Sequence, residues 1–383
     1  MVASPLSWPR VDLMITFDHV SKRYPDGTLA VDDLSFECAD GEITVMVGTS
    51  GCGKTTTLRM INRLVEPTSG TISVDGKDVT KSDPAQLRRS MGYVIQQGGL
   101  FPHRTIIDNI ATVPRLLGTS RGQARARAYE LLTLVGLEES MAKRYPFQLS
   151  GGQQQRVGVA RALAADPPVL LMDEPFSAVD PVVRGELQRE LQRLQSQLRK
   201  TIVFVTHDID EAIKLGDKIA VMQVGGHLVQ FDRPERILAR PKDKFVESFI
   251  GVDRGIRWLS FFKAEQLSLR STAMVLTTAS ADEAREVAAD EGTQWLLALD
   301  PDRRPVGWLQ AAQLNGKVSI DIADLRSLGH TFKPGEDSLR AALDASVLSP
   351  AGVAVAVDED GVVLGVVDSD DINDAIRVAS GTV

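Results

Sequence analysis

The chain has 383 residues, a length that suggests two or three domains. Apolar residues make up 43% of it and charged residues 25%, as in ordinary globular proteins, and no stretch approaches the roughly 18 consecutive apolar residues of a membrane span. The net charge of −8 is unevenly divided, because residues 263–383 carry 20 Asp and Glu against 10 Lys and Arg. This acidic excess argues for a separate module there and against a basic surface for nucleic acid or anionic lipid.

The N-terminal residues 1–13 are expected to lie outside the folded protein. They precede Met14 and lack the apolar segment of a signal peptide, so they predict a disordered extension or a start assigned too early. The first recognisable strand begins at Ile15. Cys38 and Cys52 lie far apart and show neither disulfide nor metal spacing, which favours a cytoplasmic chain.

The run from Gly48 to Thr55 reads Gly-Thr-Ser-Gly-Cys-Gly-Lys-Thr and fills every fixed position of the phosphate-binding pattern G-x-x-x-x-G-K-[ST]. An apolar strand, 43–47, leads into it and a helical segment, 56–64, leads out of it. The glycines let backbone N–H groups turn inward around phosphate oxygens, and the helix N-terminus adds its positive end. Lys54 supplies a charge for the terminal phosphates, and the Thr55 hydroxyl can ligate Mg²⁺. The alternative, a glycine-rich turn with a chance Lys-Thr, does not explain the flanking strand and helix.

A second apolar strand, 169–172, ends in two adjacent acids, Asp173 and Glu174. An apolar strand that ends in Asp is typical of the second half of a phosphate-loop ATPase, where Asp173 helps to hold Mg²⁺ directly or through water. Glu174 lies one residue further along, where a carboxylate can orient and polarise the attacking water. The sequence therefore predicts an ATP-hydrolysing site that uses Mg²⁺.

Residues 149–153 read Leu-Ser-Gly-Gly-Gln and are followed by Gln-Gln-Arg, which is the signature of the ATP-binding cassette (ABC) ATPases. The chain closely resembles this family, and the other family motifs follow in the family's order. Tyr24 stands where the family stacks an aromatic ring on adenine, and Gln96 stands in the Q-loop. Residues 177–180 match the D-loop, and His207 is at the switch-histidine position. Taken singly, these residues also fit a loop aromatic, a solvated amide and a histidine at a strand end.

The resemblance implies a role for each of these residues. The implied catalytic residues are Glu174, His207 and Gln96, the metal ligands are Thr55, Gln96 and Asp173, and the cofactor-binding residues are Tyr24, Gly48, Thr49, Ser50, Gly51, Cys52, Gly53, Lys54, Thr55, Thr56, Ser150, Gly151, Gly152, Gln153 and Asp180. In this family two cassettes associate head to tail, so that ATP lies between the phosphate loop of one and the signature of the other. Ser150, Gly151 and Gly152 then offer a hydroxyl and N–H groups across a homodimer interface.

The C-terminal residues contain a weak internal repeat, at about 264–314 and 327–377. Each copy reads strand, helix, strand, acidic turn, strand, with helices expected at 281–291 and 337–345, and Asp300 and Gly307 match Asp358 and Gly365 at a common offset. The pattern resembles a tandem pair of CBS domains, a regulatory module. Only Asp371 fits the family's nucleotide-binding pattern there, so nucleotide binding, a response to ionic strength and plain dimerisation all remain open.

The predicted fold is α/β: an ABC-type phosphate-loop ATPase domain over 14–252 with a helical subdomain at about 97–165, a linker over 253–262, and a smaller α+β CBS-like module over 263–383. Within the family, segments 60–70, 92–97, 204–208 and 245–251 most resemble the ATPase subunit of importers for osmoprotectants such as glycine betaine, carnitine, choline or proline. The implied cofactors are ATP and Mg²⁺. The implied partners are a second ATPase subunit, integral-membrane permease subunits and, through the complex, an extracytoplasmic solute-binding protein, and no nucleic acid is expected.

The implied location is the cytoplasmic face of the cell membrane. Leu100, Phe101 and Pro102 are apolar in a loop, 98–105, that we expect to be exposed, which favours a permease contact over packing on the chain's own domain. Two alternatives remain: an ABC ATPase that serves another cargo, such as an amino acid, a polyamine or a sugar, and a soluble ABC ATPase without a transport role. The single phosphate loop and the absence of sustained heptads argue against the second.

Overall fold

The structure is a computed structural model, and it describes residues 15–95, 99–177 and 179–379. The chain forms two compact units, Met1–Gly251 and Val252–Val383. The expectations for residues 1–13 and for Gln96 lie outside the described residues. Among the helices that the structure describes, none is both long enough and apolar enough to span a bilayer.

The first unit is built on a six-stranded sheet in the order β10-β9-β3-β8-β7-β6. Its strands are β3 (Ile43–Gly48), β6 (Met91–Val94), β7 (Val169–Asp173), β8 (Thr201–Thr206), β9 (Lys218–Gln223) and β10 (His227–Asp232). Adjacent strands in the series β9, β3, β8, β7 and β6 pair in parallel, and β10 pairs antiparallel with β9. Every residue of β3, β7 and β8 is buried, as expected for parallel strands covered on both faces. The carboxyl ends of these strands share one edge of the sheet, which brings Gly48, Asp173 and Thr206 close together.

A second, antiparallel sheet has the order β2-β1-β4-β5. Its strands are β1 (Ile15–Arg23), β2 (Leu29–Cys38), β4 (Ser69–Val74) and β5 (Lys77–Asp78). Helix α1 (Lys54–Ile61) contacts strands of both sheets, and one apolar core joins them. Phe17 and Phe36 stack in that core with ring centroids 4.6 Å apart. Burial in it raises the pKa of the Cys38 thiol to about 12.

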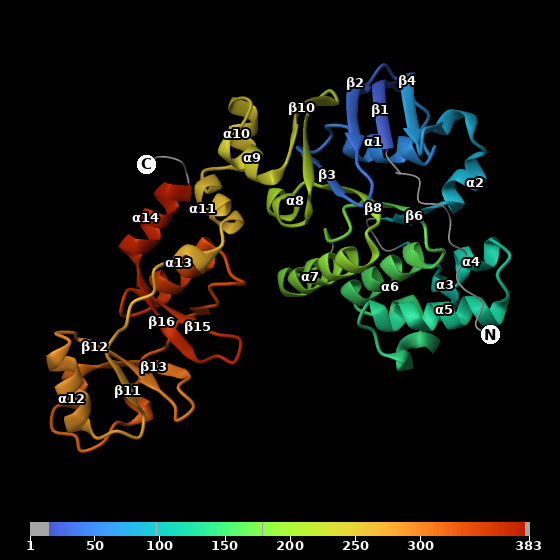
Figure 1. The fold of residues 1–383 in the computed structure, drawn as a ribbon. Helices are drawn as coiled ribbons and strands as arrows, with labels where there is room; N and C mark the ends of the chain where they lie inside the picture. The colour runs from blue at the N-terminus through green and yellow to red at the C-terminus, as the bar shows by residue number, and fades with distance from the viewer. Residues whose placement is uncertain (1–14, 96–98, 178, 380–383) are drawn as a thin grey trace. The chain divides into compact units, whose positions relative to one another are not determined.

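Four helices gather at one end of this unit: α3 (Ile106–Ile110), α4 (Thr112–Leu116), α5 (Arg121–Leu134) and α6 (Gly151–Leu163) (Figure 1). They pack on one another, and α6 also contacts β6. The remaining helices of the unit are α2 (Pro84–Arg89), α7 (Pro181–Leu198), α8 (Ile209–Leu215), α9 (Pro234–Ala239) and α10 (Lys244–Ile250). Several begin with a side-chain cap, as α6 does at Ser150 and α7 at Asp180.

The second unit begins with α11 (Arg254–Trp258) and contains two three-stranded sheets, each with a helix between its first two strands. One copy consists of β11 (Met274–Leu276), α12 (Ala281–Asp290), β12 (Trp295–Leu299) and β13 (Pro305–Gln310). The other consists of β14 (Thr331–Phe332), α13 (Leu339–Leu348), β15 (Val353–Val357) and β16 (Val363–Asp368), followed by α14 (Ser369–Ala379). The predicted architecture, an α/β unit followed by a smaller α+β unit, is confirmed.

The two copies are structural repeats in detail. In each, the first strand pairs in parallel with the second, and the last strand pairs antiparallel. Gly307 lies opposite Ala298, and Gly365 lies opposite Ala356. A Cβ on either glycine would lie under 3 Å from a backbone carbonyl oxygen, so the match of the two glycines reflects the same close approach of two chain segments.

Helix ends differ from their sequence expectations by a few residues. The helix expected at 56–64 is Lys54–Ile61, because Gly53, with a φ of 93°, starts it early and Arg63, with a φ of 54°, lies beyond its end. The helix expected at 337–345 is Leu339–Leu348, because the Ser338 side chain caps it.

Candidate functional site

The phosphate loop is fixed by backbone contacts at two of its glycines. A Cβ on Gly48 would lie 2.1 Å from the Met222 carbonyl oxygen, and one on Gly53 would lie 2.2 Å from the Ala30 carbonyl oxygen. Gly51 has a φ of 77° and nothing within 4 Å of its Cβ position, so that side of the loop is open. The loop is thus pressed against neighbouring strands on one side and accessible on the other, which is the arrangement required for N–H groups that receive an anion.

Lys54 is the cation of this loop, and its surroundings are neutral. Its Nζ donates to the carbonyl oxygens of Gly48 at 2.8 Å and Thr49 at 3.0 Å and lies 3.5 Å from Cys52 Sγ. The side chain is buried, and among the described residues it has no carboxylate partner. No carboxylate of the described residues neutralises its positive charge, and an anion in the loop would supply that partner.

Asp173 stands at the end of β7 and is bonded to the first turn of α1. Its Oδ1 accepts from Thr55 Oγ1 at 2.8 Å, and its Oδ2 lies 3.5 Å from Arg59 Nη2 and 3.4 Å from the Tyr93 hydroxyl. Sequence reasoning missed Arg59 and Tyr93 as partners of Asp173. Arg59 lies one helical turn after Thr55, which was a readable signal, whereas the position of Tyr93 depends on β6 being the neighbour of β7.

Glu174 and His207 meet at the same sheet edge. His207 Nδ1 lies 3.2 Å from Glu174 Oε2, although the two residues follow different strands, β7 and β8. Glu174 has a φ of 44°, which is uncommon for a residue other than glycine. The Glu174 N–H donates to the Val205 carbonyl at 3.0 Å, and the Ser177 hydroxyl donates to the Glu174 carbonyl at 3.0 Å. These two bonds hold the unusual backbone and thereby the direction of the carboxylate.

Tyr24 directly follows β1, a strand of the other sheet, and lies beside the start of α1. Its hydroxyl is 3.3 Å from Thr56 Oγ1, and Lys22 Nζ lies 5.2 Å from the centre of its ring. An aromatic ring is thus present next to the phosphate loop.

The signature residues lie on a separate part of the unit, at the start of α6. Ser150 and Gln153 form a capping box, with Ser150 N donating to Gln153 Oε1 at 3.0 Å and Gln153 N donating to Ser150 Oγ at 3.3 Å. Ser150 and Gly151 are exposed. All of the residues 48–56 and 150–153 are described, and no hydrogen bond joins the two groups. A single chain therefore presents two half-sites: the loop with Asp173, Glu174, His207 and Tyr24, and the signature.

These residues fit a magnesium nucleotide. The open loop and the buried Lys54 suit phosphate oxygens, and the Thr55 hydroxyl and Asp173 carboxylate are hard oxygen donors of the kind that Mg²⁺ prefers. The parallel sheet, its loop after β3 and the acid at the end of β7 define the chain as a phosphate-loop ATPase.

Residues 31–177 match the family described as ABC transporter. The chain is 47% identical over 315 residues to the carnitine transport ATP-binding protein OpuCA of Listeria monocytogenes, across 82% of this chain and 79% of that protein. It is 43% identical over 347 residues to the osmoprotectant import ATP-binding protein OsmV of Salmonella typhimurium, across 90% of each chain. Among solved structures, it matches the dimeric ATP-binding cassette MJ0796 in a post-hydrolysis state with ADP and Pi at 34% identity and a TM-score of 0.52, over 57% of this chain and 98% of that one.

The chain belongs to the ABC transporter family, as its sequence predicted. It is an ATPase that uses ATP and Mg²⁺.

Proposed function

We propose that this chain is the ATP-hydrolysing subunit of a binding-protein-dependent importer of osmoprotectants, such as glycine betaine, carnitine, choline or proline. The observation that carries the proposal is the similarity over 90% of both chains to a protein named for osmoprotectant import, which extends well beyond the ATPase unit. The printed name of OpuCA, carnitine transport, points to the same class of cargo.

The proposed chemistry assigns one task to each residue of the loop site. Lys54 and the loop N–H groups bind the phosphates, and Tyr24 stacks on adenine. Thr55, Asp173 and Gln96 hold Mg²⁺, which when bound withdraws charge from the phosphate oxygens. Glu174 orients and polarises the attacking water, and His207 holds the Glu174 carboxylate in place through the contact at 3.2 Å.

The proposed assembly is a head-to-tail homodimer. It is supported by the separation of the two half-sites in one chain and by the dimeric state of the solved relative. Ser150, Gly151, Gly152 and Gln153 of one subunit then complete the site of the other, and Asp180, which accepts from Val183 N at 3.1 Å, holds the D-loop end at that interface.

The proposed permease contact lies on the helical end of the ATPase unit. A groove of about 590 Å³ there is lined by Phe101, Leu116 and the arginines Arg104, Arg115, Arg121 and Arg125. Phe101 and Leu116 are exposed, and Arg104 stacks over the Phe101 ring at 4.9 Å from its centre. Exposed apolar side chains among several arginines, one of which is paired with Asp108, suit a protein segment. Binding of permease subunits at this groove would place the chain on the cytoplasmic face of the membrane. The second unit is proposed to be a tandem CBS-like regulatory module.

Uptake of labelled glycine betaine, choline and proline in a strain that lacks this gene tests the proposal, with and without added salt. The parent chain should restore uptake of at least one of these solutes. The Glu174→Gln chain should not, because loss of a positioned base lowers turnover by roughly 10²–10⁴-fold while ATP still binds. Phe101→Ala should keep the ATPase activity of the isolated subunit and lower uptake. If the parent restores uptake of methionine, a polyamine or a sugar and of none of these solutes, the cargo assignment is wrong.

A further inference from the structure

A cluster of polar side chains joins the start of α7 to the segment that follows β8. Arg184, in the first turn of α7, is its centre. Its Nη2 donates to the Val179 carbonyl at 3.2 Å, its Nη1 lies 3.6 Å from Asp208 Oδ2, and its Nε lies 3.9 Å from Glu211 Oε1. One guanidinium therefore contacts both the segment that follows β7 and the segment that follows β8.

The cluster continues into the interior through Glu211. Glu211 is 5% exposed, and its carboxylate accepts from Thr206 Oγ1 at 2.7 Å and from Gln188 Nε2 at 3.4 Å. Lys214 Nζ donates to Gln188 Oε1 at 3.0 Å. Burial raises the pKa of Glu211. A buried polar network of this kind is costly to break at any member, so it holds its two ends in a defined relative position.

Both ends of the network lead to Glu174. On one side, the Thr206 hydroxyl accepts from Asp208 N at 3.0 Å, and the residue between them is His207, which contacts the Glu174 carboxylate. On the other side, the Val179 N–H donates to the Phe176 carbonyl at 3.2 Å, and Ser177 donates to the Glu174 carbonyl. Arg184 thus ties together the two segments that flank the Glu174–His207 pair.

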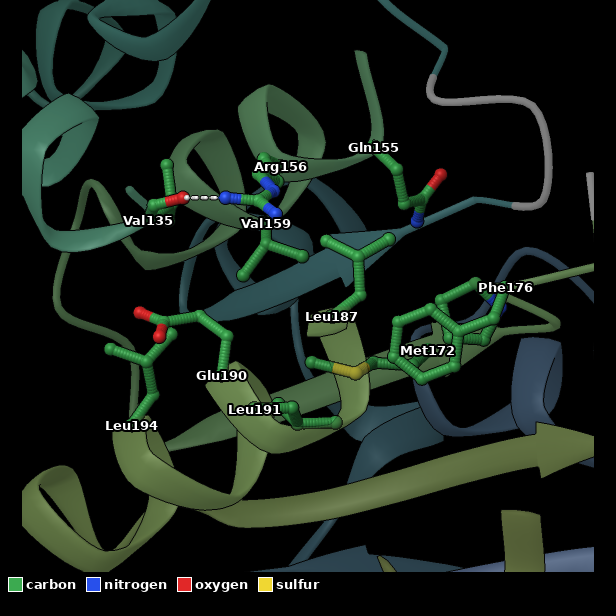
Figure 2. Close-up of a pocket in the computed structure, with 11 residues that line it drawn as sticks. Val135, Gln155, Arg156, Val159, Met172, Phe176, Leu187, Glu190, Leu191 and Leu194 are labelled. Atoms are coloured by element: carbon green, nitrogen blue, oxygen red, sulfur yellow. Dashed lines mark hydrogen bonds between the residues drawn. The ribbon is translucent and has the colours of Figure 1, made fainter. Parts of the chain in front are cut away.

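A small, water-sized cavity lies beneath α7. This cavity of about 20 Å³ lies between α6, α7 and β7, lined by Phe176, Leu187 and Leu191 among others (Figure 2). Gln155 also lines it, is 4% exposed, and has an Nε2 without a hydrogen-bond partner in the described part of the chain.

We propose that Arg184 is a positioning residue for hydrolysis: it fixes the Val179 segment and the Asp208–Glu211 segment relative to each other and so keeps His207 in contact with Glu174. The inference rests on the proposed roles of Glu174 and His207. It extends them to a residue that touches neither the nucleotide-binding loop nor the signature, and that no sequence motif singled out.

The test compares Arg184→Ala and Asp208→Asn with Arg189→Ala, a control on the exposed side of the same helix. Asn at position 208 can still cap α8, where Asp208 Oδ1 accepts from Asp210 N at 2.8 Å, so that variant removes the charge facing Arg184 and keeps the helix start. ATPase rates of the full chain should show a kcat lower by about three- to thirtyfold in the first two variants, with the KM for ATP within about twofold of the parent. The kcat of the double variant should be little lower than that of Arg184→Ala alone, because both substitutions remove the same contact between Arg184 and Asp208.

A second readout does not depend on turnover. In the nucleotide-free protein, hydrogen exchange should rise in both 176–183 and 208–215 in Arg184→Ala and in neither segment in Arg189→Ala. A kcat that stays unchanged in Asp208→Asn, a double variant whose loss is the product of the two single losses, or faster exchange in only one segment would overturn the proposal. If Arg184→Ala fails to fold, Asp208→Asn decides the question alone. Failure of the proposed role of Glu174 is seen separately, as near-normal turnover in Glu174→Gln.

Discussion

Two cations in this chain stand in opposite electrostatic settings. Lys54 in the ATPase unit is buried, and its Nζ donates to neutral groups, the carbonyl oxygens of Gly48 and Thr49 and the Cys52 sulfur. Arg270 in the C-terminal unit has a side chain that is 59% exposed, and its guanidinium donates to Asp368 Oδ2 at 2.9 Å and Asp371 Oδ1 at 2.6 Å. A cation surrounded by carbonyls can exchange them for phosphate oxygens, whereas a cation already paired with two carboxylates has little to gain from an incoming anion.

This difference bears on the open question about the second unit. Asp371 is the one residue there that fits the nucleotide-binding pattern of CBS domains, and its carboxylate accepts a hydrogen bond from Arg270. The equivalent positions of the first repeat are Gln310 and Gln313, which carry no charge. The comparison therefore favours a single nucleotide site per chain, at the phosphate loop.

The largest expected effect is that of Lys54→Ala. Loss of charge-assisted bonds to the phosphates, each contributing about 1.5–3 kcal/mol, should raise the dissociation constant for ATP by at least about 100-fold. Titration of a fluorescent ATP analogue measures this, with Lys143→Ala, an exposed lysine on the helical end, as the matched control. Binding as tight as that of the parent would show that Lys54 does not contact the nucleotide.

Substitution of two glycines of the loop by Ala should have a smaller effect, on the free energy of unfolding, and the two variants serve as controls for each other. Gly53→Ala places a methyl group 2.2 Å from the Ala30 carbonyl oxygen at a φ of 93°, and should lower the free energy of unfolding by about 2–4 kcal/mol. Gly51→Ala meets no atom within 4 Å and keeps only the cost of its positive φ, about 1 kcal/mol. Chemical denaturation of both variants checks the order, and an equal loss would mean that contact with β2 does not fix the loop.

The smallest expected effect is that of Arg270→Ala. Exposed ion pairs contribute about 0–1 kcal/mol, so unfolding of the C-terminal unit should shift by no more than that, and the shift should shrink at high salt. ATPase activity measured alongside should equal that of the parent. A loss of several kcal/mol would show that Arg270 holds the two repeats together through more than its exposed ion pairs.

The structure brings together Thr55 with Asp173 and His207 with Glu174, residues that the sequence named for the loop site because they lie in short motifs next to strands. The strand before Gly48, the strand before Asp173 and the strand before His207 are neighbours in one parallel sheet, so their carboxyl ends had to meet. Tyr93 and Arg184 could not be assigned in this way, since their partners come from strands and helices that only the sheet order brings together. Arg59 was readable, because it lies one helical turn after Thr55. The repeat in the second unit was readable from Gly307 and Gly365. The pairing of Asp371 with Arg270 was not readable, because Arg270 precedes the helices of both repeats and lies beside β16 only in the folded chain.

The stoichiometry of nucleotide binding shows whether the phosphate loop is the single nucleotide site of the chain. Calorimetric titration of the full chain with a non-hydrolysable ATP analogue and Mg²⁺ should give one nucleotide per chain, and the Lys54→Ala chain should bind none at the same concentrations. Two nucleotides per parent chain, or one that remains bound after Lys54→Ala and is lost after Asp371→Asn, would contradict the claim that the phosphate loop is the chain's single nucleotide site.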